Sequence, residues 1–192
     1  MSDAKFVVVI TGLPRSGTSA MMQTLAAGGV APLTDLARQA DMDNPRGYFE
    51  LEAVKKIATD NSFLDAARGK AVKIIHTLLA HLPLDRDYRV ILMRRDLDEV
   101  LASQRKMLTR RGHSGAALNE AQLKAVYQNQ LLQTMRWLAA HSERVRFLEV
   151  EYKKLVTAPR ATAREVNAFL GGALDEEAMA AAVDPSLYRN SG

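Results

Sequence analysis

Four short runs of apolar and β-branched residues along the chain predict β-strands. Two of them, residues 5–11 (KFVVVIT) and 88–93 (YRVILM), are almost continuously apolar. This pattern is typical of parallel strands that are covered on both faces. The other two runs occupy residues 71–76 and 145–151. Segments with helical spacing separate these runs, so the sequence predicts an α/β fold, a parallel sheet with helices on both faces.

The predicted helices carry recognisable signals at their ends. Asn119 and Gln122 stand three residues apart, the spacing of a capping box at a helix start. Pro159 lies near the beginning of the last predicted helix and Gly171 follows its end, in the usual order of these two residues. The predicted helices are residues 18–27, 51–68, 98–110, 119–141 and 161–170.

Length and composition limit the class of protein. A chain of 192 residues without repeats or linkers corresponds to a single domain, residues 1–192. The sequence contains no cysteine, which excludes disulfides, thiolate nucleophiles and cysteine-ligated metals. The longest N-terminal apolar run, residues 6–10, is too short for a signal peptide or a membrane span. We therefore expect a cytoplasmic protein without a membrane span.

The net charge of +4 suggests an anionic ligand only where positive side chains converge. One basic cluster, Arg105, Lys106, Arg110 and Arg111, has no interleaved aromatic residues. We interpret it as a solvated helix end, and we expect no nucleic acid partner. The polar, glycine-containing stretch 110–118 is expected to be a mobile surface loop that can cover a ligand.

The strongest candidate site follows the first predicted strand directly. A strand, a glycine-containing turn and a helix build an anion site, because backbone N–H groups and the helix N-terminus point at the bound oxygens. The turn is similar to the nucleotide P-loop G-x-x-x-x-G-K-[ST], but Thr18 occupies the lysine position, which argues against ATP or GTP chemistry. Arg15 can offer a forked guanidinium to the same oxygens. The candidate anion-binding residues are Gly12, Pro14, Arg15, Ser16, Gly17, Thr18 and Ser19.

This loop and a second motif resemble the PAPS-dependent sulfotransferases, where PAPS is 3′-phosphoadenosine 5′-phosphosulfate. Residues 14–19, P-R-S-G-T-S, resemble the family's 5′-phosphosulfate loop, P-[KR]-S-G-T-[ST]. Residues 95–103, RDLDEVLAS, resemble its 3′-phosphate motif, R-x-P-x-[DE]-x-x-x-S, with leucine in place of proline. Residues 150–159 resemble the v-x-Y-E-D-L-x-x-x-P segment, with two lysines where acids are common, and residues 166–171 resemble the family's "FLG" ending.

The resemblance implies a reaction and a set of binding residues. Arg95 at the end of a predicted strand and Ser103 on the following helix can converge on one phosphate, and the resemblance makes it the 3′-phosphate of PAPS. The family's C-terminal R-K-G-x-x-G motif is missing, and Arg189 is the candidate substitute. The implied reaction moves a sulfuryl group from PAPS to a hydroxyl or amine of a small molecule or glycan, releases the bisphosphate PAP, and requires no metal.

Catalysis also calls for a cation at the leaving group and a general base for the acceptor. Arg15 is the expected cation. Two bases remain open: Glu50, in the polar segment after the loop, and His76, at the end of the second strand. His76 stands roughly where many family members have K-x-H, but here the spacing from Lys73 is one residue longer.

Two other functions fit the same fold. A P-loop kinase for a small molecule is the first, and the missing lysine at position 18 speaks against it. A non-catalytic nucleotide-binding protein is the second, and it would bind PAP without transfer. A homodimer is also compatible with the sequence.

Overall fold

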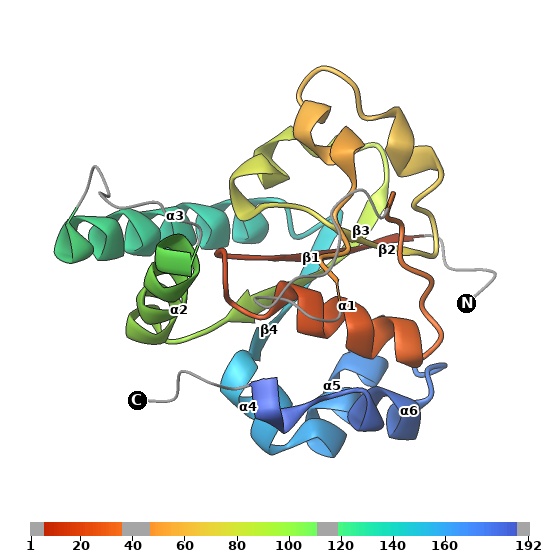
Figure 1. Cartoon of the computed structure of the whole chain (residues 1–192). Coiled ribbons are helices and arrows are strands. Elements are labelled where there is room, and N and C mark those ends of the chain that lie inside the picture. Colours follow the sequence, from red (N-terminus) through yellow and green to blue (C-terminus); the bar gives the residue numbers. More distant parts are fainter. Residues whose placement is uncertain (1–5, 36–46, 111–118, 188–192) are drawn as a thin grey trace.

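A computed structural model describes residues 6–35, 47–110 and 119–187. Within these residues the centre of the molecule is a parallel four-stranded sheet (Figure 1) with the order β2-β1-β3-β4. The predicted α/β class is confirmed, and three of the four strands lie within one residue of their predicted ends. The strands are β1 (Phe6–Gly12), β2 (Ala71–Lys73), β3 (Asp87–Arg94) and β4 (Val145–Glu151).

Helices cover both faces of the sheet, as the sequence predicts. One buried cluster joins β1 and β3 to the helices drawn below the sheet in Figure 1, and a second joins the sheet to short 3₁₀ helices above it and to the end of α3. The lower helices are α1 (Thr18–Ala27), α4 (Tyr152–Thr157), α5 (Pro159–Leu170) and α6 (Glu176–Ala181). The 3₁₀ helices are η1 (Glu52–Lys56), η2 (Ser62–Asp65) and η3 (His76–His81), and η4 (Pro185–Leu187) follows α6.

Two further helices stand at the carboxyl ends of the strands, on the left in Figure 1. They are α2 (Leu97–Arg110) and α3 (Glu120–Ala140). Leu13 of the loop after β1 packs into a third buried cluster with Val100 and Leu101 of α2 and Tyr127 of α3. This cluster attaches both helices to the edge of the sheet where parallel strands usually bind ligands.

The helix predicted for residues 51–68 is wrong, because this segment contains only η1 and η2 with turns between them. Its apolar residues, including Val54, Ile57 and Leu64, are buried against the sheet as a helical pattern would require. A local side-chain bond forms between η1 and η2, however: the Asp60 carboxylate accepts from the Ser62 N–H at 3.0 Å. Such side-chain bonds compete with the helical ladder.

The second strand is also shorter than predicted. It ends at Lys73, three residues before His76, which begins η3 instead of closing the strand. The pairing of β2 with β1 covers only three residues, and Ile74 makes the last backbone contact through its N–H to the Ile10 carbonyl at 3.0 Å. The two short helices α4 and α6 were not predicted.

Helix signals at other ends are confirmed. Asn119 and Gln122 form the reciprocal capping box, with both hydrogen bonds at 2.9 Å. Pro159 opens α5, and Gly171 closes it in the left-handed conformation at φ 109°. In the described ranges no helix is both long enough and apolar enough to cross a membrane. Most of the stretch expected to be a covering loop, residues 111–118, lies outside those ranges.

Candidate active site

The loop between β1 and α1 is shaped by two glycines. Gly12 has φ 151° and Gly17 has φ 97°, values that side-chain-bearing residues rarely adopt. A Cβ on Gly12 would lie 2.6 Å from the Met93 carbonyl oxygen, and one on Gly17 would lie 2.3 Å from the ring of Tyr152. The glycines therefore let the loop pack directly against β3 and α4, a requirement of the protein's own packing in addition to any ligand.

Arg15 stands in the middle of this loop in an uncommon backbone conformation. Its φ of 68° is left-handed, which costs a non-glycine residue about 1–3 kcal/mol and persists only where the surroundings impose it. Its Nε donates a hydrogen bond to the Ser103 hydroxyl of α2 at 2.9 Å. The guanidinium is thereby anchored to the second motif, 88 residues further along the chain.

Arg95 follows β3 and reaches the same loop. Its Nη1 donates to the Arg15 carbonyl at 3.2 Å, and its Nε donates to the Glu99 carboxylate at 2.8 Å. Its guanidinium lies 4.7 Å from the centre of the Tyr152 ring, a cation–π contact. The Arg95 side chain is only 7% exposed. The structure thus brings Arg15, Arg95 and Ser103 together, with Arg15 in contact with both of the others.

Tyr152 is a site neighbour that the sequence analysis did not assign. It is the first residue of α4, and its ring packs between Gly17 and Arg95. Burial raises the pKa of its hydroxyl, and the positive charges of Arg95 and Arg15 partly oppose that rise. The tyrosine in the segment 150–159 was the available signal.

The loop also presents donors suited to an anion. No side chain caps the first turn of α1 among the described residues, so its N–H groups point outward without a capping partner. The Ser16 hydroxyl is buried, and no described residue forms a hydrogen bond with it. Buried hydroxyls are normally hydrogen-bonded. Both features fit a loop that completes its bonding with a phosphate or sulfate group.

A second cluster lies beside the start of α1 and contains Glu50. Lys73, the last residue of β2, donates from Nζ to the Tyr48 carbonyl at 3.0 Å. The same Nζ lies 3.4 Å from the Ser19 hydroxyl and 3.6 Å from the Glu50 carboxylate. The side chains of Lys73 and Glu50 are 16% and 36% exposed. Lys73 thus places a mostly buried positive charge between the loop and a candidate base.

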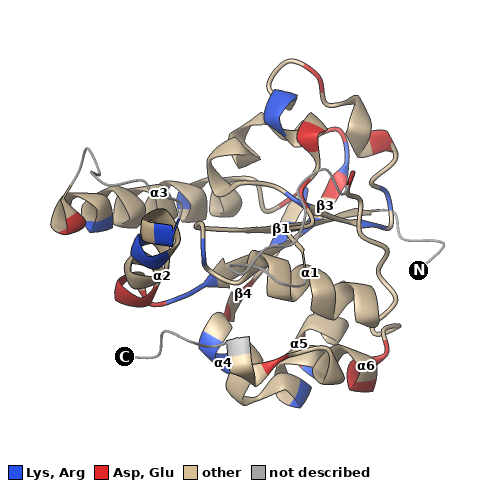
Figure 2. Ribbon diagram, viewed as in Figure 1, with Lys and Arg blue, Asp and Glu red and all other residues tan. Residues whose placement is uncertain are grey.

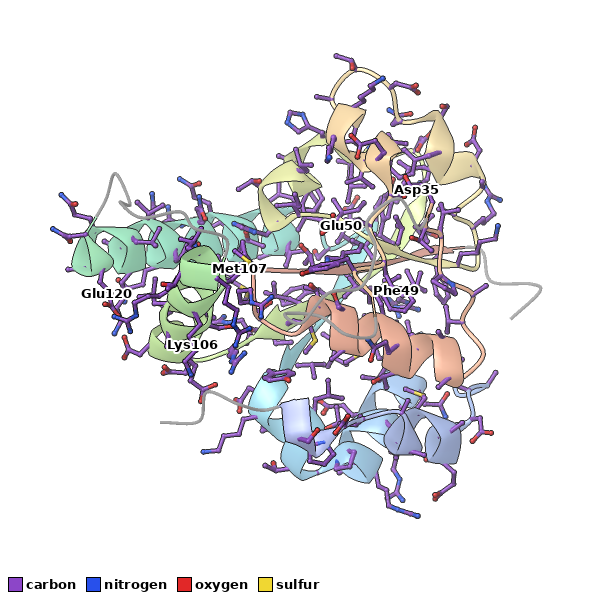
Figure 3. The ribbon with its side chains drawn as sticks, in the orientation of Figure 1. Asp35, Phe49, Glu50, Lys106, Met107 and Glu120 are labelled. Carbon is purple, nitrogen blue, oxygen red and sulfur yellow. The ribbon has the colours of Figure 1, made fainter. Side chains whose placement is uncertain are left out.

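The backbone around Glu50 is held at both ends. The Tyr48 carbonyl accepts from Lys73 and, at 3.3 Å, from the Ser19 hydroxyl. The Glu50 carbonyl accepts from the Thr34 hydroxyl at 2.7 Å. Between the two, Phe49 adopts a left-handed φ of 52°. Figure 3 shows Phe49 and Glu50 near α1, with Lys106 and Met107 on α2 across from them.

His76 is placed differently from Glu50. Its Nδ1–H donates to the Gly12 carbonyl at 3.1 Å, and its Nε2 lies 3.0 Å from the Gln130 side-chain oxygen of α3. The residue is 5% exposed. Both ring nitrogens are therefore engaged with protein groups, and His76 ties the base of the loop to α3.

A cleft of about 1060 Å³ adjoins Arg95 between the start of α2 and the ends of β3 and β4. Its charges are of both signs, as Figure 2 shows for α2, and Arg94 pairs with Glu149 across it at 2.8 Å. The charged lining is Arg94, Arg95, Arg105, Lys153, Lys154, Asp96, Asp98, Glu99, Glu120, Glu149 and Glu151.

Arg189, the candidate substitute for the missing C-terminal motif, lies outside the described residues. Among the residues that the structure describes, no three His, Asp or Glu side chains are grouped as metal ligands.

Comparisons with known proteins bear on the family and on the fold. The model of the sulfotransferase family matches residues 70–176, which include Arg95 and Ser103. The sulfotransferase domain of the Synechococcus PCC 7002 olefin synthase is 20% identical, with a TM-score of 0.58 over 99% of this chain and 82% of that one. The sulfotransferase domain of the curacin biosynthetic pathway is 12% identical, with a TM-score of 0.52 over 95% and 88%. These two structures share the fold, and no curated protein matches the sequence.

Proposed function

Because the chain belongs to the sulfotransferase family, we propose that it transfers a sulfuryl group from PAPS to a hydroxyl or amine acceptor and releases PAP. One observation carries the proposal. Arg15 bonds through its side chain to Ser103 and through its carbonyl to Arg95, which joins the loop after β1 to the motif after β3. A ligand with phosphate groups at two ends fits such a pair of adjoining anion sites.

Members of this family generally take PAPS as the sulfuryl donor, and PAPS supplies the group already activated for transfer. The loop fits the 5′ end, through the uncapped N–H groups of α1 and the Ser16 hydroxyl. Arg95 and Ser103 fit the 3′-phosphate. The Ser103 hydroxyl accepts from Arg15 and so keeps its own hydrogen to donate to a phosphate oxygen.

Two cations, one within the loop and one beside it, would stabilise the charge that develops during transfer. Arg15, anchored at Nε, holds a fixed positive charge within the loop, where charge accumulates on the leaving phosphate. Lys73 holds a second one beside Ser19 and Glu50. Because both are fixed by the fold, they need no reorganisation when the reaction occurs. The proposal requires no metal ion.

Of the two candidate bases, the geometry favours Glu50. Its carboxylate is partly exposed beside Lys73 and can receive a proton from an acceptor hydroxyl or amine. His76 is buried with both ring nitrogens engaged, so removing a substrate proton would require one of these bonds to break. We assign His76 to positioning the loop through the Gly12 carbonyl.

The test is a transfer assay with PAPS and a panel of hydroxyl and amine acceptors, with PAP release measured by chromatography. A parallel reaction with ATP and Mg²⁺ tests the kinase alternative. We expect acceptor-dependent PAP release and no phosphoryl transfer. Phosphoryl transfer from ATP without PAP release would overturn the proposal, and binding of PAP without any transfer would favour a nucleotide-binding role.

A further inference from the structure

A second pocket lies at the amino ends of the strands, at the end of the sheet opposite the loop. It opens beside the amino ends of β1 and β4 and the last turn of α5, and its volume is about 550 Å³. This lies within the size range of small-molecule pockets. Its walls include Phe6, Phe147 and Phe169, and its polar lining includes Arg89 and Arg146. We refer to it as the Arg89–Arg146 pocket.

The two arginines are direct neighbours in the sheet. Arg89 of β3 is paired in register with Arg146 of β4, so both side chains leave the same face. Like charges placed opposite each other on neighbouring strands destabilise a sheet. Of the described residues that line the pocket, none is acidic. The nearby Asp87 carboxylate is engaged by Arg144 at 3.1 Å.

Arg89 is held in place by aromatic rings instead of by a carboxylate. Its guanidinium lies 5.2 Å from the centre of the Phe6 ring and 5.6 Å from that of Phe169. Burial, and secondarily the charge of Arg146, lowers the pKa of Arg89 from its ordinary value, and the charge of Asp87, which lies outside the pocket lining, partly opposes this. The pocket therefore contains positive charge that its own lining does not neutralise, in contrast to the balanced cleft beside Arg95.

We propose that the Arg89–Arg146 pocket binds a small organic anion whose carboxylate or phosphate group meets the two guanidiniums and whose apolar part packs against Phe169 and Leu170 of α5. A guanidinium presents parallel N–H donors that match the paired oxygens of either group. The cation–π contacts fix the Arg89 guanidinium before a ligand arrives, which lowers the entropy lost on binding. A bound anion would also remove the repulsion between the paired arginines.

The test is an NMR titration of the ¹⁵N-labelled full chain with four probes, carried out with PAP present in excess to fill the loop. Benzoate and phenyl phosphate carry both the ring and the anionic group, benzyl alcohol lacks the charge, and inorganic phosphate lacks the ring. We expect saturable shifts at residues 144–147 and 168–171 with benzoate or phenyl phosphate, and the stronger of these two identifies the preferred head group. Benzyl alcohol should give none, and inorganic phosphate should bind more weakly.

Variants separate this site from other anion-binding surfaces. Arg146 is exposed, so Arg146→Ala should leave the fold intact and weaken benzoate or phenyl phosphate about tenfold or more, while Arg146→Lys keeps part of the affinity. Arg160, at the other end of α5 and paired with Glu177, is the matched control, and Arg160→Ala should change nothing. Three outcomes would each overturn the proposal: no saturable shift with either probe, equal affinity in Arg146→Ala, or shifts confined to the loop that disappear in Arg15→Ala.

Discussion

Arg15 combines a strained backbone with an anchored side chain, and this combination is typical of a residue kept for function. A left-handed φ would be relieved by glycine, yet the chain places a long cation there and fixes it to Ser103. The strained conformation of Arg15 therefore lowers the stability of the fold and fixes the position of one positive charge.

If that charge acts mainly during transfer, Arg15→Ala should lower turnover by about a hundredfold or more, the usual loss when one preorganised donor is removed. PAP affinity should fall less, and Arg15→Lys should keep part of the rate. Single-turnover kinetics with PAPS, together with calorimetric PAP affinity, measure both effects. An equal loss of rate and affinity in Arg15→Ala would make Arg15 a binding residue without a catalytic role.

Arg95 and Ser103 should distinguish nucleotides by their 3′-phosphate. Charge-assisted contacts of this kind contribute about 1.5–3 kcal/mol, so PAP should bind roughly ten- to a hundredfold more tightly than 5′-AMP. Arg95→Ala should abolish most of that preference, and Ser103→Ala should reduce it. Titration calorimetry gives the six affinities of wild type, Arg95→Ala and Ser103→Ala for the two nucleotides. Arg160→Ala, which removes an arginine paired with Glu177 away from the site, is the control for the loss of charge. Wild-type protein that binds the two nucleotides equally would remove this assignment.

Glu50 and His76 can be separated by the turnover and the PAP affinity of their variants. Glu50→Gln should lower turnover by about 10²–10⁴-fold and leave PAP affinity nearly unchanged. His76→Asn should instead weaken PAP binding and lower the melting temperature, because it loosens the contact between Gly12 and Gln130. If His76→Asn instead lowers turnover by this factor at unchanged PAP affinity, and Glu50→Gln does not, the two roles are reversed.

At the scale of elements, the sequence predicted well wherever local signals and packing agree. The long helix α3 was found to within one residue at each end because Asn119 and Gln122 mark its start and apolar residues recur along it. Residues 51–68 have the same periodicity, but the bond from the Ser62 N–H to Asp60 favours a turn, and single-sequence spacing could not weigh that competition.

For the site, too, the sequence predicted the local features and missed those that depend on contacts between distant segments. The Arg15 loop and the Arg95 motif are contiguous in sequence and could be identified there. Lys73 and Tyr152 could not be assigned, because their importance arises only when β2 and α4 bring them to the loop. The residue type and position of His76 suggested a place in the site. Its two hydrogen-bond partners come from β1 and α3, so its role depends on contacts distant in sequence.

The capping box of α3 gives a stability prediction at this scale. Asn119→Ala should destabilise the protein by about 1 kcal/mol, because the Gln122 N–H loses its side-chain acceptor. Equilibrium urea unfolding measures this change, and Asn119→Ser should restore most of it. Sulfuryl transfer should be unchanged, since the cap lies on an exposed turn. Loss of PAP binding in Asn119→Ala would show instead that the start of α3 supports the site.

For the molecule as a whole, PAP should stabilise the folded state by mass action. At a PAP concentration a hundred times its dissociation constant the gain is about 2.7 kcal/mol, which for a chain of this size raises the melting temperature by roughly 5–10 °C. Differential scanning calorimetry measures the shift. Arg95→Ala, titrated at the same PAP concentration, should show a smaller one, and a shift of equal size with 5′-AMP would contradict the assignment of the 3′-phosphate.

The contact of Arg95 with the Arg15 carbonyl bears on how the chain acquires its ligand. Arg15 and Arg95 follow β1 and β3, two strands that pair from Phe6 to Gly12 and from Asp87 to Met93, with more than 70 residues of chain between them. Neither half of the site exists in a nascent or partly unfolded chain until β1 and β3 have found each other, and this long-range pairing is slow to form. We therefore expect the chain to bind the nucleotide only after β1 and β3 have paired, late in folding. A fragment that ends before β3 should have the loop sequence but no preference for PAP.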